Sequence, residues 1–395
     1  MFDIDKKITD KKMKSMILEN LELIQNMSVK EYTLYKKWTQ LNLPTFVKFS
    51  KDNKVRISEI KNNIWCPNNI NDYENLNIDV IPVETIDQQI VWRTLRNFCH
   101  SSVWNASPGR MGKFIVVHKE TKKDPFFGIE KINYKYLGII SLASDFLAVG
   151  GRDEKIGWTS EDKFNGKLNY IAMASTISPT QPLGFNYVGG KLIALMSCSD
   201  VVEKWWNNQY NEQFLCGITT TSLYGGYSQY NNLKYWKKCK STKGNVIIEP
   251  TENIYELMKV WLRQNYKERY DAIHENKSDS GVVKSHPKLR IMTLAYTILS
   301  GIPEIKTNAS RGVYWCPLYE NSESFLRNET QKIENKRFDN SVKSLSDLWK
   351  QKYAKKRVDN LIKNGIMDNT KTLFYDDMIG HKWENVKEKY LEKDE

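Results

Sequence analysis

The chain has 395 residues, enough for one large domain or two ordinary ones, and 12% of them are aromatic, which excludes a disordered polymer. Its 59 Lys and Arg residues exceed its 47 Asp and Glu residues and give a net charge of +12. This excess favours a polyanionic partner, with nucleic acid first, although a lysine-rich solvated surface produces the same balance.

No run of apolar residues is long enough to cross a bilayer, and the charged start Met1–Lys7 lacks the apolar region of a signal peptide. The six cysteines are scattered, and none forms a C-x-x-C pair. We therefore expect a cytoplasmic protein with reduced thiols, no metal site and no membrane partner.

The first hundred residues are predicted to be mainly helical. Apolar residues recur at helical spacing between residues 8 and 40, and again between Thr85 and His100. The polar, asparagine-rich stretch 50–80 between them predicts a long irregular connection.

Residues 105–250 are predicted to form a mixed α/β core, because the apolar pattern there alternates and then becomes helical. Residues 110–119 and 136–144 are expected to pair as an antiparallel hairpin. A turn is expected at Gly150–Trp158, followed by strand 168–177, a turn-rich loop, helix 191–206, strand 216–225 and a short helix. Strands 168–177 and 216–225, joined through that long helix, are predicted to be parallel neighbours.

Beyond residue 250 the pattern predicts helices at 254–270 and 287–300, a short strand at 312–319, and a Lys- and Arg-rich helical stretch at 330–364. The predicted organisation is a helical region 1–104, an α/β core 105–250, a helical part 251–329 packed on the core, and a basic helical tail 330–395.

Gly189 and Gly190 stand just before the predicted helix 191–206. Backbone N–H groups at a helix start can hold a phosphate, but a tight strand-to-helix turn needs the same glycines. Because Lys191 is followed by Leu192, the P-loop pattern fails, and a P-loop NTPase is excluded.

Arg152-Asp153 lies in the glycine-flanked predicted turn, where the pair is either a salt-bridged support or a clamp for substrate or nucleic acid. We expect its replacement by alanine to impair function more than folding, since charge near a core is costly unless it is used or paired. Tyr227, Tyr230 and Tyr235 follow the second strand, and one of these phenols is a candidate general acid.

Several motifs in order resemble the DruA proteins of Druantia anti-phage systems. The resemblance covers roughly 105–245, and Arg152-Asp153-x-x-Ile156-Gly157-Trp158 is its most specific part. The other motifs are Gly109-Arg110, Leu137-Gly138, the strand Leu168–Ile177, the loop Pro182–Lys191 and the stretch Cys216–Gly244. The loop Ser178–Pro182 departs from the asparagine-rich turn of that family.

This core in turn resembles an acyltransferase of the GNAT type, which implies a mixed central sheet flanked by helices. The resemblance implies that a coenzyme A thioester is held at the loop and helix start Tyr187, Val188, Gly189, Gly190 and Lys191. It also implies that Tyr230 is the catalytic acid. Arg152 and Asp153 are further candidate catalytic residues because of their place in the glycine-flanked turn.

The basic tail suggests where DNA binds. The candidate nucleic-acid-binding residues, with Trp349 and Tyr353 among them as stacking candidates, are Lys350, Lys352, Lys355, Lys356 and Arg357. The alternative is that the two aromatic residues dock the tail on the core and the lysines are only solvated. Three functions remain open: a nucleic-acid-directed protein of phage conflict that transfers an acyl-type group to a nucleobase, a small-molecule or protein N-acyltransferase, and a non-enzymatic DNA-binding or structural protein. The first also predicts protein partners from a defence or phage system.

Overall fold

The computed structural model describes residues 7–99, 109–123, 130–211, 213–222, 228–241, 246–247, 249–275, 287–303, 306–307, 311–365 and 375–391. The chain divides into two compact units, each assembled from separate stretches. The helical unit comprises Met1–Asp52, Asn245–Asn308 and Tyr375–Glu395, and the sheet unit comprises Asn53–Gly244 and Ala309–Phe374. Their bounds therefore do not follow the four consecutive regions predicted from sequence.

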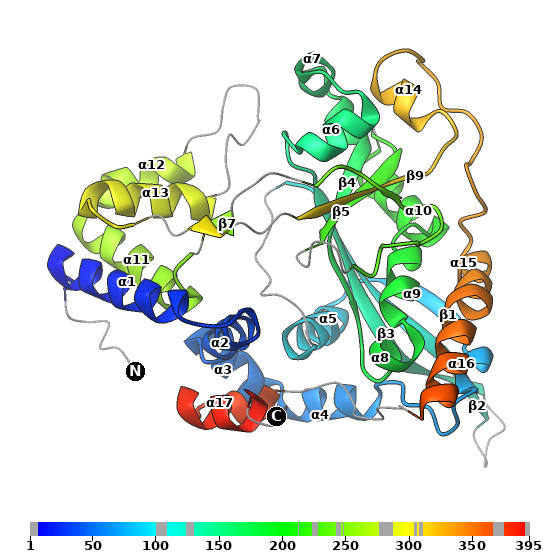
Figure 1. Ribbon diagram of the computed structural model, residues 1–395, viewed down its shortest axis with the longest axis horizontal. Coiled ribbons are helices and arrows are strands. Elements are labelled where there is room, and N and C mark those ends of the chain that lie inside the picture. The colour runs from blue at the N-terminus through cyan, green and yellow to red at the C-terminus, as the bar shows by residue number, and fades with distance from the viewer. Residues whose placement is uncertain are drawn as a thin grey trace. The chain divides into compact units, whose positions relative to one another are not determined.

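The sheet unit contains a seven-stranded mixed sheet in the order β1-β2-β3-β4-β5-β9-β6 (Figure 1). Only β4 and β5 are parallel, and all other neighbours are antiparallel. The strands are β1 (Ile78–Pro82), β2 (Met111–Lys123), β3 (Glu130–Ser144), β4 (Ile171–Pro179), β5 (Gly217–Ser222), β9 (Gly312–Pro317) and β6 (Lys237–Lys238). The predicted mixed sheet, the β2–β3 hairpin and the parallel β4–β5 pair are confirmed.

Helices cover both faces of this sheet, which explains why its central strands are apolar on both sides. Phe114 and Val116 of β2 face one core, and Ile115 and Val117 between them face another. The helices are α4 (Lys54–Asn62), α5 (Ile86–Phe98), α6 (Gly150–Ile156), α7 (Ser160–Phe164), α8 (Leu183–Tyr187), α9 (Gly189–Met196), α10 (Asp200–Gln209), α14 (Ser322–Leu326), α15 (Val342–Trp349) and α16 (Lys355–Asn364). Short 3-10 turns lie at η1 (Asp72–Asn75) and η2 (Lys167–Tyr170).

The helical unit packs its own apolar core around α1, α11 and α13, with Met13, Ile17, Met258, Trp261 and Ala295 fully buried. Its helices are α1 (Asp10–Gln25), α2 (Val29–Leu41), α3 (Pro44–Asp52), α11 (Glu252–Asn265), α12 (Lys267–Glu275), α13 (Pro287–Leu299) and α17 (Trp383–Leu391). A 3-10 turn, η4 (Tyr375–Met378), and the two-stranded sheet β7 (Val246–Ile247) with β8 (Lys306–Thr307) complete the unit.

Several local predictions are wrong. The predicted helix 254–270 is divided into α11 and α12, and residues 330–341 of the predicted helical stretch 330–364 are not helical. The predicted turn at Gly150–Trp158 is the helix α6, which ends at Gly157 in the left-handed conformation. The predicted irregular stretch 50–80 contains α4 and the start of β1. The predicted helix 191–206 is two helices, α9 and α10, separated at Ser197–Ser199. Finally, residues 228–236 form turns and not a short helix, because Asn232 and Tyr235 have positive φ angles of 56° and 75°.

Candidate functional site

Arg152 lies at the centre of a buried ionic cluster. Its side chain is fully buried, and its guanidinium forms ion pairs with Asp145 (3.0 Å) and Asp153 (2.6 Å). The same guanidinium donates to the carbonyl oxygens of Phe146 (2.8 Å) and Leu147 (3.3 Å). Arg152 therefore has no free donor to offer a substrate, and its fork supports the segment that follows β3.

The two carboxylates of the cluster are also occupied. Thr219 of β5 donates its hydroxyl to Asp145 at 2.5 Å, and Lys163 forms an ion pair with Asp153 at 2.7 Å. The backbone N–H of Val149 donates to Asp153 as well. Every charged group of the cluster is thus paired within the protein, as buried charge requires.

The predicted cofactor residues lie together at the start of α9, but they face other parts of the chain and not solvent. Gly189 and Gly190 are both buried. A Cβ atom on Gly190 would lie 2.0 Å from Oε1 of Gln229, and one on Gly189 would lie 2.7 Å from Cγ of Leu183. The two glycines thus allow other parts of the chain to approach the helix start closely, because glycine has no side chain to block the approach.

Lys191 holds the same region closed. Its ammonium group donates to the carbonyl oxygens of Gln229 (3.0 Å) and Asn231 (2.5 Å) and lies 5.2 Å from the ring centre of Tyr353. Burial lowers the pKa of Lys191. Lys191 thereby fastens the turn at 228–232 to α9.

The other two predicted cofactor residues have structural positions. Tyr187 is fully buried and contacts the rings of Trp65 and Tyr73 at 5.4 and 5.6 Å between centroids. Val188 has a φ of 48°, the left-handed conformation in which α8 ends and α9 begins. A pyrophosphate at this helix start would have to displace Gln229.

We expect Gly190→Ala to lower the free energy of unfolding by about 1–3 kcal/mol, because the new methyl group displaces Gln229 from its hydrogen bonds. In a Gln229→Ala background the space is free, and the same substitution should cost clearly less. Urea unfolding of the four proteins of this double-mutant cycle measures the difference. Equal costs in both backgrounds would show that Gly190 is not present to admit Gln229.

Tyr230 is brought to the same place but is not exposed. Its side chain is buried against Trp236 and Tyr314, and its hydroxyl accepts a hydrogen bond from Gln229 at 3.1 Å. Burial raises the pKa of Tyr230 despite a further hydrogen bond with Thr220. A general acid must reach its substrate, so this arrangement gives Tyr230 a packing role in the described conformation. Tyr227 lies outside the described residues.

The parallel strands β4 and β5 separate soon after they begin. They pair over three positions only, ending at Met173 opposite Thr219. Beyond that point, side-chain hydrogen bonds replace the backbone pairing: Thr220 donates its hydroxyl to the carbonyl of Ala174 at 2.9 Å. Farther along, the Gln229 amide donates to the carbonyl of Ile177 at 3.3 Å. The notch between two diverging central strands is therefore filled by residues of the chain itself.

The basic stretch is part of the sheet unit and not an appendage. α15 and α16 are continuous through one π-helical segment, η3 (Lys350–Ala354). Trp349 is fully buried and Tyr353 is 9% exposed, both in the main core. Neither ring is available to stack on a base, so these two aromatic residues anchor the helix instead.

The π segment explains the irregular apolar spacing of this helix. The step from Tyr353 to Val358 is one residue longer than a helical turn allows, and the extra residue is absorbed within η3. Val358 and Leu361 thus stay buried, while Lys355 and Lys356 before them are exposed. The tail carries a rigid outer face as a result.

That outer face is basic. Lys350 to Asn364 contains six cations and one acid, Asp359. Among the residues that the structure describes, the exposed ammonium groups of Lys355, Lys356 and Lys363 have no ion-pair partner, and Lys352 contacts only the adjacent Tyr353 ring. We define Lys352 of η3, together with Lys355, Lys356 and Lys363 of α16, as the basic face of α16. Lys363 was not among the predicted residues, although it lies two helical turns beyond Lys356.

Two of the predicted basic residues differ from the rest. Lys350 donates to the carbonyl oxygens of Glu74 and Leu76, both at 2.8 Å, and burial lowers its pKa. Arg357 is exposed, and its Nε donates to the carbonyl of Phe185 at 3.3 Å. Lys350 therefore supports the fold, whereas Arg357 keeps the rest of its guanidinium at the surface.

Within the described stretches, no three His, Cys, Asp or Glu side chains are grouped so as to hold a metal ion. No described helix has the length and apolar content needed to span a bilayer.

The fold and these sites define a mixed α/β protein whose sheet carries a closed ionic cluster on one strand end and an exposed basic helix beside its core. A family model described as Druantia protein DruA matches residues 36–328, well over half of the chain. The chain belongs to this family, and membership supports a role in Druantia anti-phage defence. No curated protein and no solved structure matches it. α15 and α16 lie outside the matched range.

Proposed function

We propose that this DruA-family protein acts on DNA in anti-phage defence and contacts the phosphate backbone through the basic face of α16. The observation that carries the proposal is the absence of ion-pair partners for these lysines among the described residues. Two exposed lysines on other helices are paired instead: Lys204 with Asp200 at 2.8 Å, and Lys343 with Asp347 at 2.7 Å.

The geometry suits phosphates better than bases. Lysine is a compact point charge that binds phosphate without reading sequence, and the aromatic residues of the helix are buried. Binding at this face should therefore depend steeply on salt and little on base sequence.

A four-lysine variant tests the proposal. Replacing Lys352, Lys355, Lys356 and Lys363 by glutamine should weaken binding of the full chain to a short DNA duplex about a hundredfold at about 50 mM salt. Fluorescence anisotropy of labelled DNA measures the affinity. The outer lysines contribute little to folding, so the variant should unfold within about 0.5 kcal/mol of the parent.

A matched control removes the same charge elsewhere. Glutamine at the paired lysines Lys204, Lys267, Lys343 and Lys389 gives the same net charge, since each of these exposed side chains pairs with an aspartate. The control should bind DNA almost as tightly as the parent. If both variants lose the same DNA affinity, the loss depends on net charge alone, and α16 is rejected as the interface.

Group transfer from a coenzyme A thioester is a second candidate function, favoured by the early separation of β4 and β5 beside the start of α9, a space that Gln229 now occupies. As described, the residues at this helix start do not fit a pyrophosphate, because Gln229 and Leu183 cover the two glycines. No reaction step is therefore derived through the cofactor.

The second candidate requires the turn at 228–232 to move aside. It predicts that acetyl-coenzyme A raises the melting temperature of a Gln229→Ala variant more than that of the parent, because the variant has lost the side chain that covers Gly190. A desulfo or adenosine-only analogue serves as the control ligand. If acetyl-coenzyme A changes the melting temperature of neither protein, the coenzyme A thioester is rejected as a ligand.

A further inference from the structure

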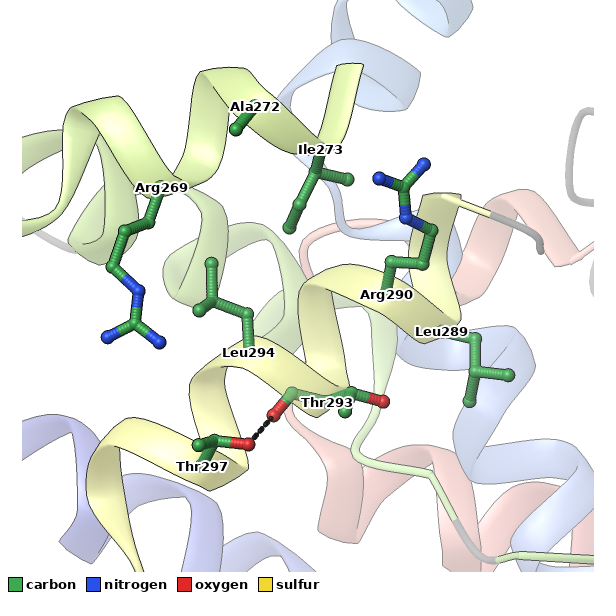
Figure 2. A pocket seen from close by; sticks show the side chains of 8 residues that line it. All are labelled: Arg269, Ala272, Ile273, Leu289, Arg290, Thr293, Leu294 and Thr297. Atoms are coloured by element: carbon green, nitrogen blue, oxygen red, sulfur yellow. Dashed lines mark hydrogen bonds between the residues drawn. The ribbon is translucent and has the colours of Figure 1, made fainter. Parts of the chain in front are cut away.

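The helical unit contains an open groove that none of the sites above uses. It has a volume of about 580 Å³ and lies between α12 and α13 (Figure 2). Its apolar floor is formed by Ala272, Ile273, Leu289 and Leu294. Leu289 is 48% exposed, which is a large apolar surface to leave in water on a helix that is otherwise packed into the core.

Two arginines border this floor. Arg269 projects from α12, and Arg290 projects from α13, with Leu294 and Ile273 between them (Figure 2). Neither guanidinium has an ion-pair partner among the described residues, and no lining residue is acidic. On the same helix α12, Asp271 forms an ion pair with Lys267 at 3.0 Å. The groove is therefore apolar in the middle and cationic at its borders.

We propose that this groove docks an amphipathic helix of a partner protein that carries acidic residues on both sides of an apolar stripe. A helix laid in a groove uses residues at i, i+3, i+4 and i+7, which matches a floor of aliphatic side chains between two arginines. Each guanidinium binds a carboxylate in a two-pronged geometry, so the charges set the register of the bound helix.

The spacing of the arginines defines the partner further. Arg269 lies toward the Leu294 and Thr297 end of the groove, and Arg290 lies on α13 four to seven residues earlier (Figure 2). At 1.5 Å per residue, the α13 positions beside the two arginines are roughly 6–10 Å apart along the helix axis. Carboxylates one to two turns apart on the partner helix therefore match the two arginines.

A nucleic acid fits the groove less well. Bases that leave the duplex are held by stacking on aromatic rings, and none of the lining residues is aromatic. The exposed leucine would gain nothing from a phosphate backbone. An acidic helix covers both the charges and the apolar floor.

The test uses the full chain and a fluorescein-labelled helical peptide with two glutamates seven residues apart and leucines at the third and fourth positions between them. Replacing Arg269 and Arg290 together by glutamine should weaken peptide binding at least about tenfold. Leu289→Ser, at an exposed position, should weaken it as well. Lys267→Gln, on the same helix but outside the groove, should leave binding unchanged, and a peptide with glutamine for glutamate should bind poorly to the parent.

Failure of the peptide to bind, or equal binding to the Arg269→Gln/Arg290→Gln variant, would overturn the proposal. A second result would also overturn the proposal: duplex or single-stranded DNA displaces the peptide, and the affinity for that DNA falls in the arginine variant. The occupant of the groove would then be nucleic acid. The proposal is independent of DNA binding at α16: the four-lysine variant should bind the peptide as the parent does.

Discussion

Replacing Arg152 by alanine should lower the free energy of unfolding by about 3–5 kcal/mol, because it leaves the buried carboxylate of Asp145 without a cation and Asp153 with Lys163 alone. Asp145 is almost entirely buried, and Asp153 is 15% exposed at its side chain. The variant would also leave the carbonyl oxygens of Phe146 and Leu147 without donors. Urea unfolding monitored by tryptophan fluorescence and far-UV circular dichroism measures the change.

Two further variants separate charge from volume. Arg152→Met keeps most of the volume and should be nearly as destabilised as the alanine variant, because the carboxylate of Asp145 remains without a cation. Adding Asp145→Asn removes the unpaired charge, while Asp153 keeps its ion pair with Lys163, and should restore part of the lost stability. A loss below about 1 kcal/mol in Arg152→Ala, together with lost defence against phage, would instead assign this cluster a direct functional role.

This expectation differs from the one that the sequence suggested. Arg152 and Asp153 are adjacent in the chain and flanked by glycine, so their pairing could be predicted, but their burial could not. The partners that close the cluster come from elsewhere: Asp145 follows β3, and Thr219 on β5 is 74 residues away from it. No spacing in a single sequence relates these positions, and only the pairing of β3, β4 and β5 brings them together.

The fold was predictable where local patterns are strong. The apolar runs of β2 and β3 and the long helical connection from β4 to β5 predicted a hairpin and a parallel pair. β1 was missed because it has five residues, ends at Pro82 and follows an asparagine-rich stretch, as a short edge strand often does. The π segment η3 was missed because a single inserted residue in a helix leaves only one long step in the apolar stripe.

The glycine pair shows how one motif supports two interpretations. Gly189 and Gly190 do precede a helix, as predicted. Whether such glycines admit a ligand or another part of the chain depends on what lies opposite, and here Gln229 comes from a turn 39 residues later in the chain. The basic residues have a similar limit. Lys350 and Lys352 look equivalent in sequence, yet only one of them reaches solvent freely.

Each lysine that neutralises a DNA phosphate releases condensed counterions, so the number of contacts can be counted from the salt dependence of binding. The most direct measurement is the slope of log affinity against log salt between about 50 and about 200 mM for the parent, the four-lysine variant and the matched control. We predict that the variant at Lys352, Lys355, Lys356 and Lys363 has a slope smaller than that of the parent by about 3 to 4, while the control keeps the parental slope. Identical slopes for all three proteins, or a parent that does not bind DNA at the lowest salt, would contradict the assignment of α16 as the DNA interface.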